Sequence, residues 1–295
     1  DRPDLFIGVD APDFNLDLEA GLRGAGLRTV HFVCPSIWAW RAGRVEKIRR
    51  SADHVLCLFP FEPELLAAHG IPATYVGHPL AGVIPQAPDR MAARRALGLP
   101  VDGEVLAVLP GSRASEVKYL AQVFLAAARL AQQQRPGLQV VVPAVPALRP
   151  AIAAAAGRGD GLRIVDGRSH EVLAACDVTL VASGTATLEA ALFKRPMVIA
   201  YRMNALSWQI MRRQALQPWV GLPNILLRER AVPELLQQDA TPAKLADAVL
   251  GWLDSPERIA QVQNKFDALH HLLRRDTATL AADALEPFLA NRAAP

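Results

Sequence analysis

Two short turns carry residue types that suit phosphate binding. Pro110-Gly111-Ser112-Arg113 follows a short apolar run and leads into a helical pattern. The glycine lets the backbone approach a ligand closely, and the N-terminus of the next helix favours an anion. The Arg113 guanidinium can donate two hydrogen bonds to one phosphate. The alternative is an ordinary helix start with a serine cap and a solvated arginine.

The second turn, residues 183–189 (SGTATLE), also follows an apolar run and opens a helix. Ser183, Gly184 and Thr185 place hydroxyl groups and backbone amides at the helix N-terminus, which again favours an anion. Glu189 follows one turn later, where a carboxylate can accept two hydrogen bonds from a ribose diol. A capped helix whose glutamate interacts with the helix dipole is the alternative. Two such turns in one sheet indicate a single diphosphate site.

Asp10 is the candidate general base of the chain. It follows the apolar run 5–9, and a carboxylate at that position can take a proton from a sugar hydroxyl. A structural hydrogen-bonding role is the alternative. Asp13 precedes a helical pattern, and we expect it to cap that helix.

Aromatic residues and a histidine follow the next apolar runs. Trp38 and Trp40 are separated by one residue and could line a substrate site with apolar and polar parts, or pack beneath the following helix. His78, in Gly77-His78-Pro79, could orient a sugar or a phosphate, although a lone histidine is more often structural. Residues 206–213 combine apolar residues with two arginines, which suits either a membrane-surface helix or a helix packed on its own core.

The elements that position these residues alternate between strands and helices. The expected strands are continuous apolar runs, as in parallel sheets covered on both faces. They span 5–9, 29–34, 54–59 and 73–76, then 105–109, 139–142, 163–165, 178–181 and 197–200. The expected helices span 14–24, 42–50, 61–69, 90–97, 115–134, 147–157, 170–175, 185–193, 242–253 and 256–273. This order predicts two doubly wound Rossmann-like domains that face a cleft, joined by the proline-rich segment 79–103.

Composition excludes several classes of protein. The 295 residues carry 32 basic and 29 acidic side chains, a near-balance that argues against bulk nucleic-acid binding. Three cysteines without a C-x-x-C pair are expected to be buried, reduced thiols. The seven histidines show no zinc-site spacing, and no Asp-x-Asp-like motif is present, so we expect no metal and no cofactor. No window approaches the ~18 apolar residues of a membrane span.

Taken together, the motifs resemble those of the lipid-A-disaccharide synthases, bacterial inverting glycosyltransferases of the GT-B type. The resemblance runs over essentially the whole chain. It rests on residues 8–15 (GVDAPDFN), 35–41 (PSIWAWR), 58–62 (LFPFE), 77–79 (GHP), 196–202 (PMVIAYR) and 222–224 (LPN), together with the two turns.

The resemblance implies transfer of 2,3-diacylglucosamine from UDP to the 6-hydroxyl of 2,3-diacylglucosamine 1-phosphate. It implies Asp10 as base, Arg113 on the diphosphate and Glu189 on the ribose, and it adds Asn224 to the substrate-binding residues. It also implies a cytoplasmic protein, peripheral at the inner membrane, and leaves a homodimer open.

Three domain ranges follow from the resemblance: 1–85 for the acceptor, 86–270 for UDP-sugar, and a C-terminal helical segment, 271–295, that packs back on the first domain. The family begins with a further quarter of sequence, so we expect the first domain to be incomplete. Two alternatives stay open: another UDP-sugar enzyme of the GT-B type, or a fragment that binds UDP-sugar or a membrane without turnover.

Overall fold

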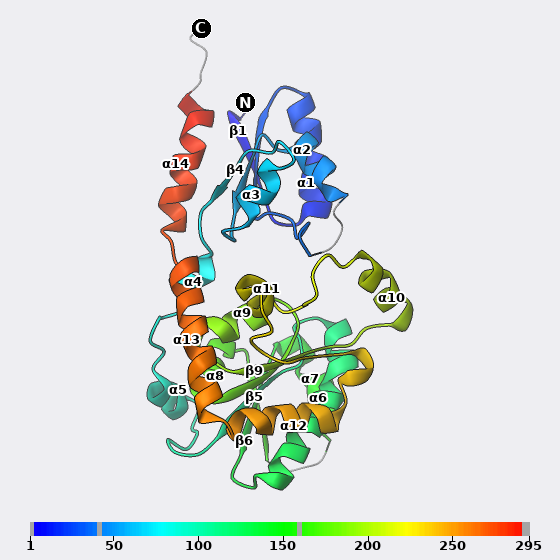
Figure 1. Ribbon diagram of the computed structural model, residues 1–295, viewed down its shortest axis with the longest axis vertical. Coiled ribbons are helices and arrows are strands. Elements are labelled where there is room, and N and C mark those ends of the chain that lie inside the picture. The colour runs from blue at the N-terminus through cyan, green and yellow to red at the C-terminus, as the bar shows by residue number, and fades with distance from the viewer. Residues whose placement is uncertain (1–2, 40–42, 158–160, 291–295) are drawn as a thin grey trace. The chain divides into compact units, whose positions relative to one another are not determined.

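The computed structural model describes residues 3–39, 43–157 and 161–290 (Figure 1). The chain divides into two compact units, each built on a parallel sheet. The first unit comprises Asp1–Val83, Met211–Gln217 and His271–Pro295. The second comprises Ile84–Ile210 and Pro218–His270.

The first unit has four parallel strands in the order β1-β2-β3-β4, which is the order of the sequence. The strands are β1 (Leu5–Val9), β2 (Arg28–Phe32), β3 (His54–Cys57) and β4 (Ala73–Tyr75). Its helices are α1 (Pro12–Gly24), α2 (Arg44–Ser51), α3 (Glu62–Ala67), α4 (Pro79–Val83) and α14 (Thr277–Ala290). The four predicted strands of this unit are confirmed, with ends that differ by up to two residues.

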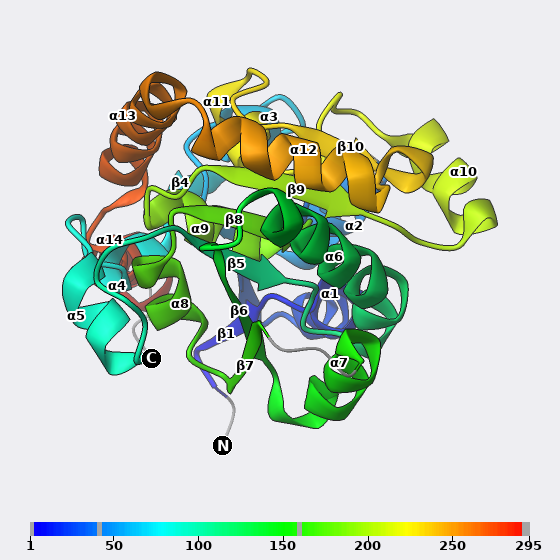
Figure 2. The same cartoon turned by 90° about the horizontal axis from the view of Figure 1, so that it is seen from below.

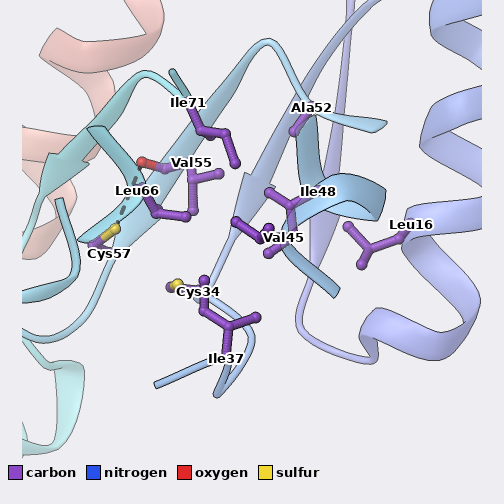
Figure 3. Packing of buried hydrophobic residues seen from close by; sticks show 10 residues of the cluster. All are labelled: Leu16, Cys34, Ile37, Val45, Ile48, Ala52, Val55, Cys57, Leu66 and Ile71. Atoms are coloured by element: carbon purple, nitrogen blue, oxygen red, sulfur yellow. Dashed lines mark hydrogen bonds between the residues drawn. The ribbon is translucent and has the colours of Figure 1, made fainter. Parts of the chain in front are cut away.

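Apolar side chains cover both faces of this sheet, as the continuous apolar runs predict. On one face, Val55 of β3 belongs to a core formed with α1, α2 and α3 (Figure 3). On the other face, the next residue, Leu56, packs in a cluster with Leu280, Leu285 and other residues of α14. Successive side chains of a strand point to opposite faces, so the two clusters lie on either side of the sheet.

The second unit has six parallel strands in the order β10-β9-β8-β5-β6-β7. They are β5 (Val105–Leu109), β6 (Gln139–Ala144), β7 (Leu162–Asp166), β8 (Val178–Ala182), β9 (Met197–Tyr201) and β10 (Glu234–Leu236). The helices are α5 (Arg90–Ala96), α6 (Ala114–Gln134), α7 (Arg149–Ala156), α8 (Ser169–Ala175), α9 (Thr185–Leu192), α11 (Leu222–Leu227) and α12 (Pro242–Leu253). The helices α10 (Ala205–Gln214) and α13 (Pro256–Leu273) each have residues in both units. The sequence did not predict β10, because three half-buried residues that include a glutamate give no apolar run.

The direction in which successive strands are added across the sheet reverses between β5 and β8. From β5 the chain steps through β6 to β7, whereas from β8 it steps the other way, through β9 to β10. Crossovers between parallel strands are right-handed, so these two series place their helices on opposite faces of the sheet. The contacts agree: α6 packs with α7 and α12, and α8 packs with α9 (Figure 2). The carboxyl ends of β5 and β8 therefore lie at a topological switch point, where open sheets of this kind bind ligands.

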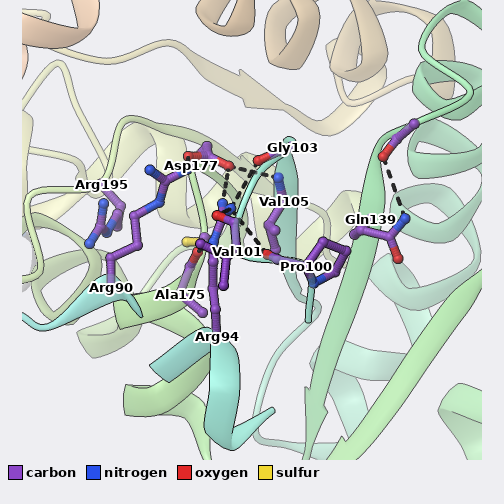
Figure 4. A network of polar contacts seen from close by, with 12 residues as sticks. Arg90, Arg94, Pro100, Val101, Gly103, Val105, Gln139, Ala175, Asp177 and Arg195 are labelled. Atoms are coloured by element: carbon purple, nitrogen blue, oxygen red, sulfur yellow. Dashed lines mark hydrogen bonds and ion pairs between the residues drawn. The ribbon is translucent and has the colours of Figure 1, made fainter. Parts of the chain in front are cut away.

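A half-buried ion pair joins the starts of β5 and β8 (Figure 4). The Asp177 carboxylate accepts the Val105 amide at 2.7 Å, and the Asp177 amide donates to the Val105 carbonyl at 2.8 Å. Arg94, which is completely buried, donates to the same carboxylate oxygen, Oδ2, at 2.7 Å. Its remaining N–H groups donate to the carbonyl oxygens of Ala175, Val101 and Gly103. Arg90 forms a second ion pair with Asp177.

None of the helices that the structure describes is both long and apolar enough to cross a bilayer.

We predict that Arg94→Met lowers the free energy of unfolding of the second unit by about 3 kcal/mol, because it removes the buried partner of the half-buried Asp177 carboxylate and leaves three carbonyl groups without their donor. Urea unfolding measures the change. The matched control is Arg95→Met on the exposed side of α5, which should change stability by no more than about 0.5 kcal/mol. Equal stability of the two variants would contradict the role given to Arg94.

Candidate functional site

The two phosphate-type turns line one pocket of the second unit. Leu109 of β5 pairs with Val181 of β8, so the strands end in step and the turns that follow them are neighbours. The pocket has a volume of about 340 Å³. Its lining includes the seven residues of the two turns that were predicted to meet the substrate: Gly111, Ser112, Arg113, Ser183, Gly184, Thr185 and Glu189. The residues Glu116, Pro143, Ala144, Val145, Gly167 and Ser169 complete most of the remaining wall.

Glu116 organises the turn between β5 and α6. Its carboxylate accepts the backbone amides of Ser112 at 2.9 Å and Arg113 at 3.3 Å. These two amides, which precede the first residue of α6, are therefore occupied by Glu116 in this structure. The φ angle of Gly111 is +124°, and a Cβ atom there would lie 2.4 Å from the Cβ of Glu116, so the turn requires glycine.

The Arg113 guanidinium is the cation of this pocket. It is 80% exposed and lies 3.1 Å from the Glu116 carboxylate. Tyr201, at the end of β9, interacts electrostatically with both Glu116 and Arg113. Burial raises the pKa of Tyr201, and the negative charge of Glu116 raises it further. The sequence prediction missed Glu116 and Tyr201; a glutamate at the third helical position is a capping signal that could have indicated the first.

The turn between β8 and α9 places the first residues of α9 in the pocket lining. Gly184 has a φ angle of +143°, which glycine adopts without strain. The Thr187 hydroxyl and amide both donate to the Gly184 carbonyl and close the first turn of the helix. The first amides of a helix have no partner within the helix, so those at the start of α9 can serve an anion. The Ser183 hydroxyl, by contrast, donates to the Val220 carbonyl at 2.9 Å.

Glu189 lines the same pocket from the second turn of α9, with a side chain that is 19% exposed. The Nε2 atom of His170, on α8, lies 3.8 Å from its carboxylate. His170 lies close enough to help orient this carboxylate. No sequence pattern links the two residues, since they are joined only by the packing of α8 against α9.

Asp10 occupies a strained turn in the first unit. Asp10 and Ala11 both have left-handed backbones, with φ angles of 49° and 43°. The Asn15 side-chain amide donates to the carbonyls of Val9 and Asp10 at 3.0 and 2.8 Å and holds the turn. Non-glycine residues in this region cost about 1–3 kcal/mol and concentrate at functional sites. The Asp10 side chain is exposed beyond the carboxyl end of β1.

The predicted cap by Asp13 is wrong. Helix α1 begins at Pro12 with Ala11 as its N-cap residue, so Asp13 lies inside the first turn. There its carboxylate pairs with Arg44 of α2.

Trp38 is buried in the first unit. Its indole Nε1 donates to Glu62 at 3.0 Å, and its ring meets Phe59 and Phe61 edge to face. Burial raises the pKa of Glu62 to about 7, although the hydrogen bonds that it accepts from Phe59, Trp38 and Leu58 oppose the shift. Most of the indole is thus committed to the core, as in the structural alternative. Trp38 also lines a mainly apolar pocket of about 230 Å³ with Ile37, Val45, Leu65, His69, Leu216 and Gln217. Trp40 lies outside the described residues.

His78 is buried beside the ring of Phe59, at 5.6 Å between ring centroids. Burial lowers the pKa of His78 to about 4, so the ring is neutral at physiological pH. The Leu80 amide donates to its Nδ1 at 3.2 Å, which leaves Nε2 as the donor. The lowered pKa favours a neutral hydrogen bond over a charge-assisted contact with a phosphate, and the hydrogen bond to a sugar stays a prediction.

Asn224 is completely buried on α11. Its side-chain amide exchanges hydrogen bonds with the backbone of Val232 in both directions and also donates to Glu234. With its oxygen and both N–H groups engaged in the fold, Asn224 positions the segment before β10. Its surroundings do not support the predicted substrate contact.

Among the described residues, Cys34, Cys57 and Glu62 form one cluster whose ligand-type atoms lie within 4.8 Å of one another. The hydrogen bond with Cys34, burial and the charge of Glu62 all raise the pKa of Cys57, which opposes a metal-binding thiolate. Glu62 already accepts three hydrogen bonds. This cluster suits a neutral, reduced core better than a metal centre.

Comparison of sequences identifies the relatives of the chain. The sequence profile of the family described as lipid-A-disaccharide synthetase matches residues 1–286. The lipid-A-disaccharide synthase of Verminephrobacter eiseniae is 66% identical, over 98% of this chain and 76% of that protein. The corresponding enzyme of Aromatoleum aromaticum is 54% identical, over 98% of this chain and 75% of that protein.

Comparison of folds gives a consistent answer. The UDP-GlcNAc 2-epimerase from Neisseria meningitidis, solved with UDP-GlcNAc bound, superimposes with a TM-score of 0.63 at 10% identity; the match covers 96% of this chain and 76% of that one. At such identity the similarity shows the fold alone, and it confirms the predicted GT-B type. Together with the sequence matches, it establishes that the chain belongs to the lipid-A-disaccharide synthase family of glycosyltransferases.

Proposed function

We propose that the protein transfers 2,3-diacylglucosamine from UDP to the 6-hydroxyl of 2,3-diacylglucosamine 1-phosphate. The products are the β-1,6-linked lipid A disaccharide 1-phosphate and UDP. The observation that carries the proposal is the convergence of the two turns on one pocket with an exposed arginine, in a chain of this family. An assay with both lipid substrates that follows UDP and disaccharide tests it.

The pocket of the second unit suits the nucleotide part of the donor. Arg113 would meet the diphosphate together with the first amides of α9, and Glu189 would accept the ribose hydroxyls. Departure of UDP leaves negative charge on the diphosphate. Donors that are already fixed in place stabilise such charge without reorganising, which is usually a large part of catalysis.

Asp10 would act as the general base. An inverting transfer needs one base that deprotonates the attacking hydroxyl while the bond to UDP breaks. The strained turn and the two hydrogen bonds from Asn15 fix the backbone that carries this carboxylate. The first unit would thus hold the acceptor and the second unit the UDP-sugar.

Both proposed substrates carry acyl chains, so the reaction would take place at a membrane surface. We place it at the cytoplasmic face of the inner membrane, with the protein bound peripherally and either monomeric or dimeric. The apolar pocket beside Trp38 is a candidate for acyl-chain contact in the first unit.

We predict that Arg113→Ala lowers kcat/KM by roughly 10²-fold or more, because it removes the one cation that faces the pocket among the described lining residues. UDP binding, followed by calorimetry, should weaken in parallel. Lys118→Ala is the control, an exposed cation on the same helix outside this pocket. If Arg113→Ala turned over like the control, the diphosphate role would be lost.

Asp10→Asn should reduce turnover to background while UDP binding stays unchanged, because the amide cannot accept the proton of the 6-hydroxyl. Asp13→Asn, three residues along the chain, should keep most of the activity. The readouts are disaccharide formation and UDP titration. Normal turnover by Asp10→Asn would refute the base assignment even if the overall reaction were confirmed.

A further inference from the structure

Charge is distributed unevenly along the second half of the chain. Residues 190–228 contain no aspartate or glutamate, although the whole chain has 29 acidic residues. The same 39 positions include Lys194, Arg195, Arg202, Arg212, Arg213 and Arg228. Helix α10 and the segment after it lie within this stretch. Such a local excess of positive charge attracts an anionic surface.

Helix α10 also exposes apolar side chains. None of its ten residues, all of them described, is buried. Leu206 and Ile210 are 72% and 60% exposed, and they lie four positions apart, on one side of the helix. Leu216, just beyond the helix, is 52% exposed.

The half-buried and the exposed apolar side chains of α10 lie on opposite sides of the helix axis. Trp208 and Met211, three positions apart, are half-buried and turn toward the protein. At 100° per residue, Leu206, Ile210 and Arg213 fall on the other side of the helix. The helix thus has one apolar stripe toward the protein and a second, exposed stripe that includes Arg213. Arg212 is also exposed, but it falls about 40° from Trp208 around the axis.

We propose that α10 is a membrane-docking element, which inserts Leu206 and Ile210 into the interfacial region of an anionic bilayer while Arg213, on the same side, meets lipid phosphates and the exposed Arg212 adds positive charge at the flank. Exposed leucine and isoleucine beside arginine, without an acidic residue, are the features of interfacial helices. The proposal rests on the proposed function, because an enzyme with diacylated substrates must reach them at a bilayer.

Charge favours a lipid surface over a second copy of the chain as the occupant. In a symmetric dimer this patch would meet itself, and the arginines of the two copies would face one another without a carboxylate from residues 190–228. Among the described residues, moreover, neither Arg212 nor Arg213 has an ion-pair partner. An anionic bilayer supplies the missing negative charge across the whole patch.

Vesicle co-sedimentation tests the proposal, with vesicles of phosphatidylethanolamine and phosphatidylglycerol compared with vesicles of phosphatidylcholine alone. The wild-type protein should prefer the anionic vesicles and release them as salt increases. Leu206→Ser/Ile210→Ser should bind at least roughly tenfold more weakly. Arg212→Gln/Arg213→Gln should bind roughly 30-fold more weakly to the anionic vesicles alone.

Two matched variants serve as controls. Val83→Ser/Leu289→Ser removes comparably exposed apolar residues elsewhere, and Arg49→Gln/Arg50→Gln makes the same change in net charge. Both should bind vesicles like the wild type. Circular dichroism checks that every variant is folded.

Turnover measured on substrates dispersed in detergent micelles distinguishes failure of the docking role of α10 from failure of the proposed transferase reaction. The α10 variants should keep wild-type turnover on dispersed substrates and lose it on substrates held in vesicles. Unchanged vesicle binding by both α10 variants would overturn the docking role, as would loss of self-association without loss of vesicle binding. If the wild type showed no turnover in micelles while the binding differences persisted, only the proposed reaction would fail.

Discussion

The pairing of β5 with β8 is the interaction on which the candidate site depends. These two strands are distant in sequence, yet they are neighbours at the centre of the six-stranded sheet. At one end, Asp177 and Val105 exchange hydrogen bonds, and the buried Arg94 pairs with the half-buried Asp177 carboxylate. At the other end, Leu109 and Val181 are in register, so the two turns emerge side by side. The ion pair and the candidate site thus lie at opposite ends of the same strand pair.

The pocket holds opposing charges before any ligand arrives. Glu116 fixes the first turn by accepting two of its amides, and it also lies 3.1 Å from the Arg113 guanidinium. A diphosphate would compete with this carboxylate for the arginine. Glu189, also in the pocket, is suited to hydroxyl groups rather than phosphate. The arrangement favours a ligand that has both an anionic and a diol part, as a nucleoside diphosphate does.

In the first unit, too, the candidate site residues follow the ends of parallel strands, but their surroundings differ from those of the pocket in the second unit. The backbone after β1 is strained at Asp10. In the segments after β2 and β3, the aromatic rings of Trp38, Phe59 and Phe61 pack against one another. The buried Glu62 anchors that aromatic group. Trp38, a member of this aromatic group, also lines the apolar pocket of the first unit, whereas Asn15 holds the strained turn.

By itself, the sequence determined the alternation of strands and helices, because continuous apolar runs and helical periodicity are local properties. It also located the two turns and Asp10, since glycine, hydroxyl and carboxylate residues after a strand have a local chemical meaning. Only the tertiary structure decided which strands are neighbours, that Glu116 occupies the amides of the first turn, and that His170 reaches Glu189. It likewise buried Asn224. These outcomes depend on contacts between residues that are apart along the chain or on competition for one hydrogen-bond donor, and no local pattern specifies either.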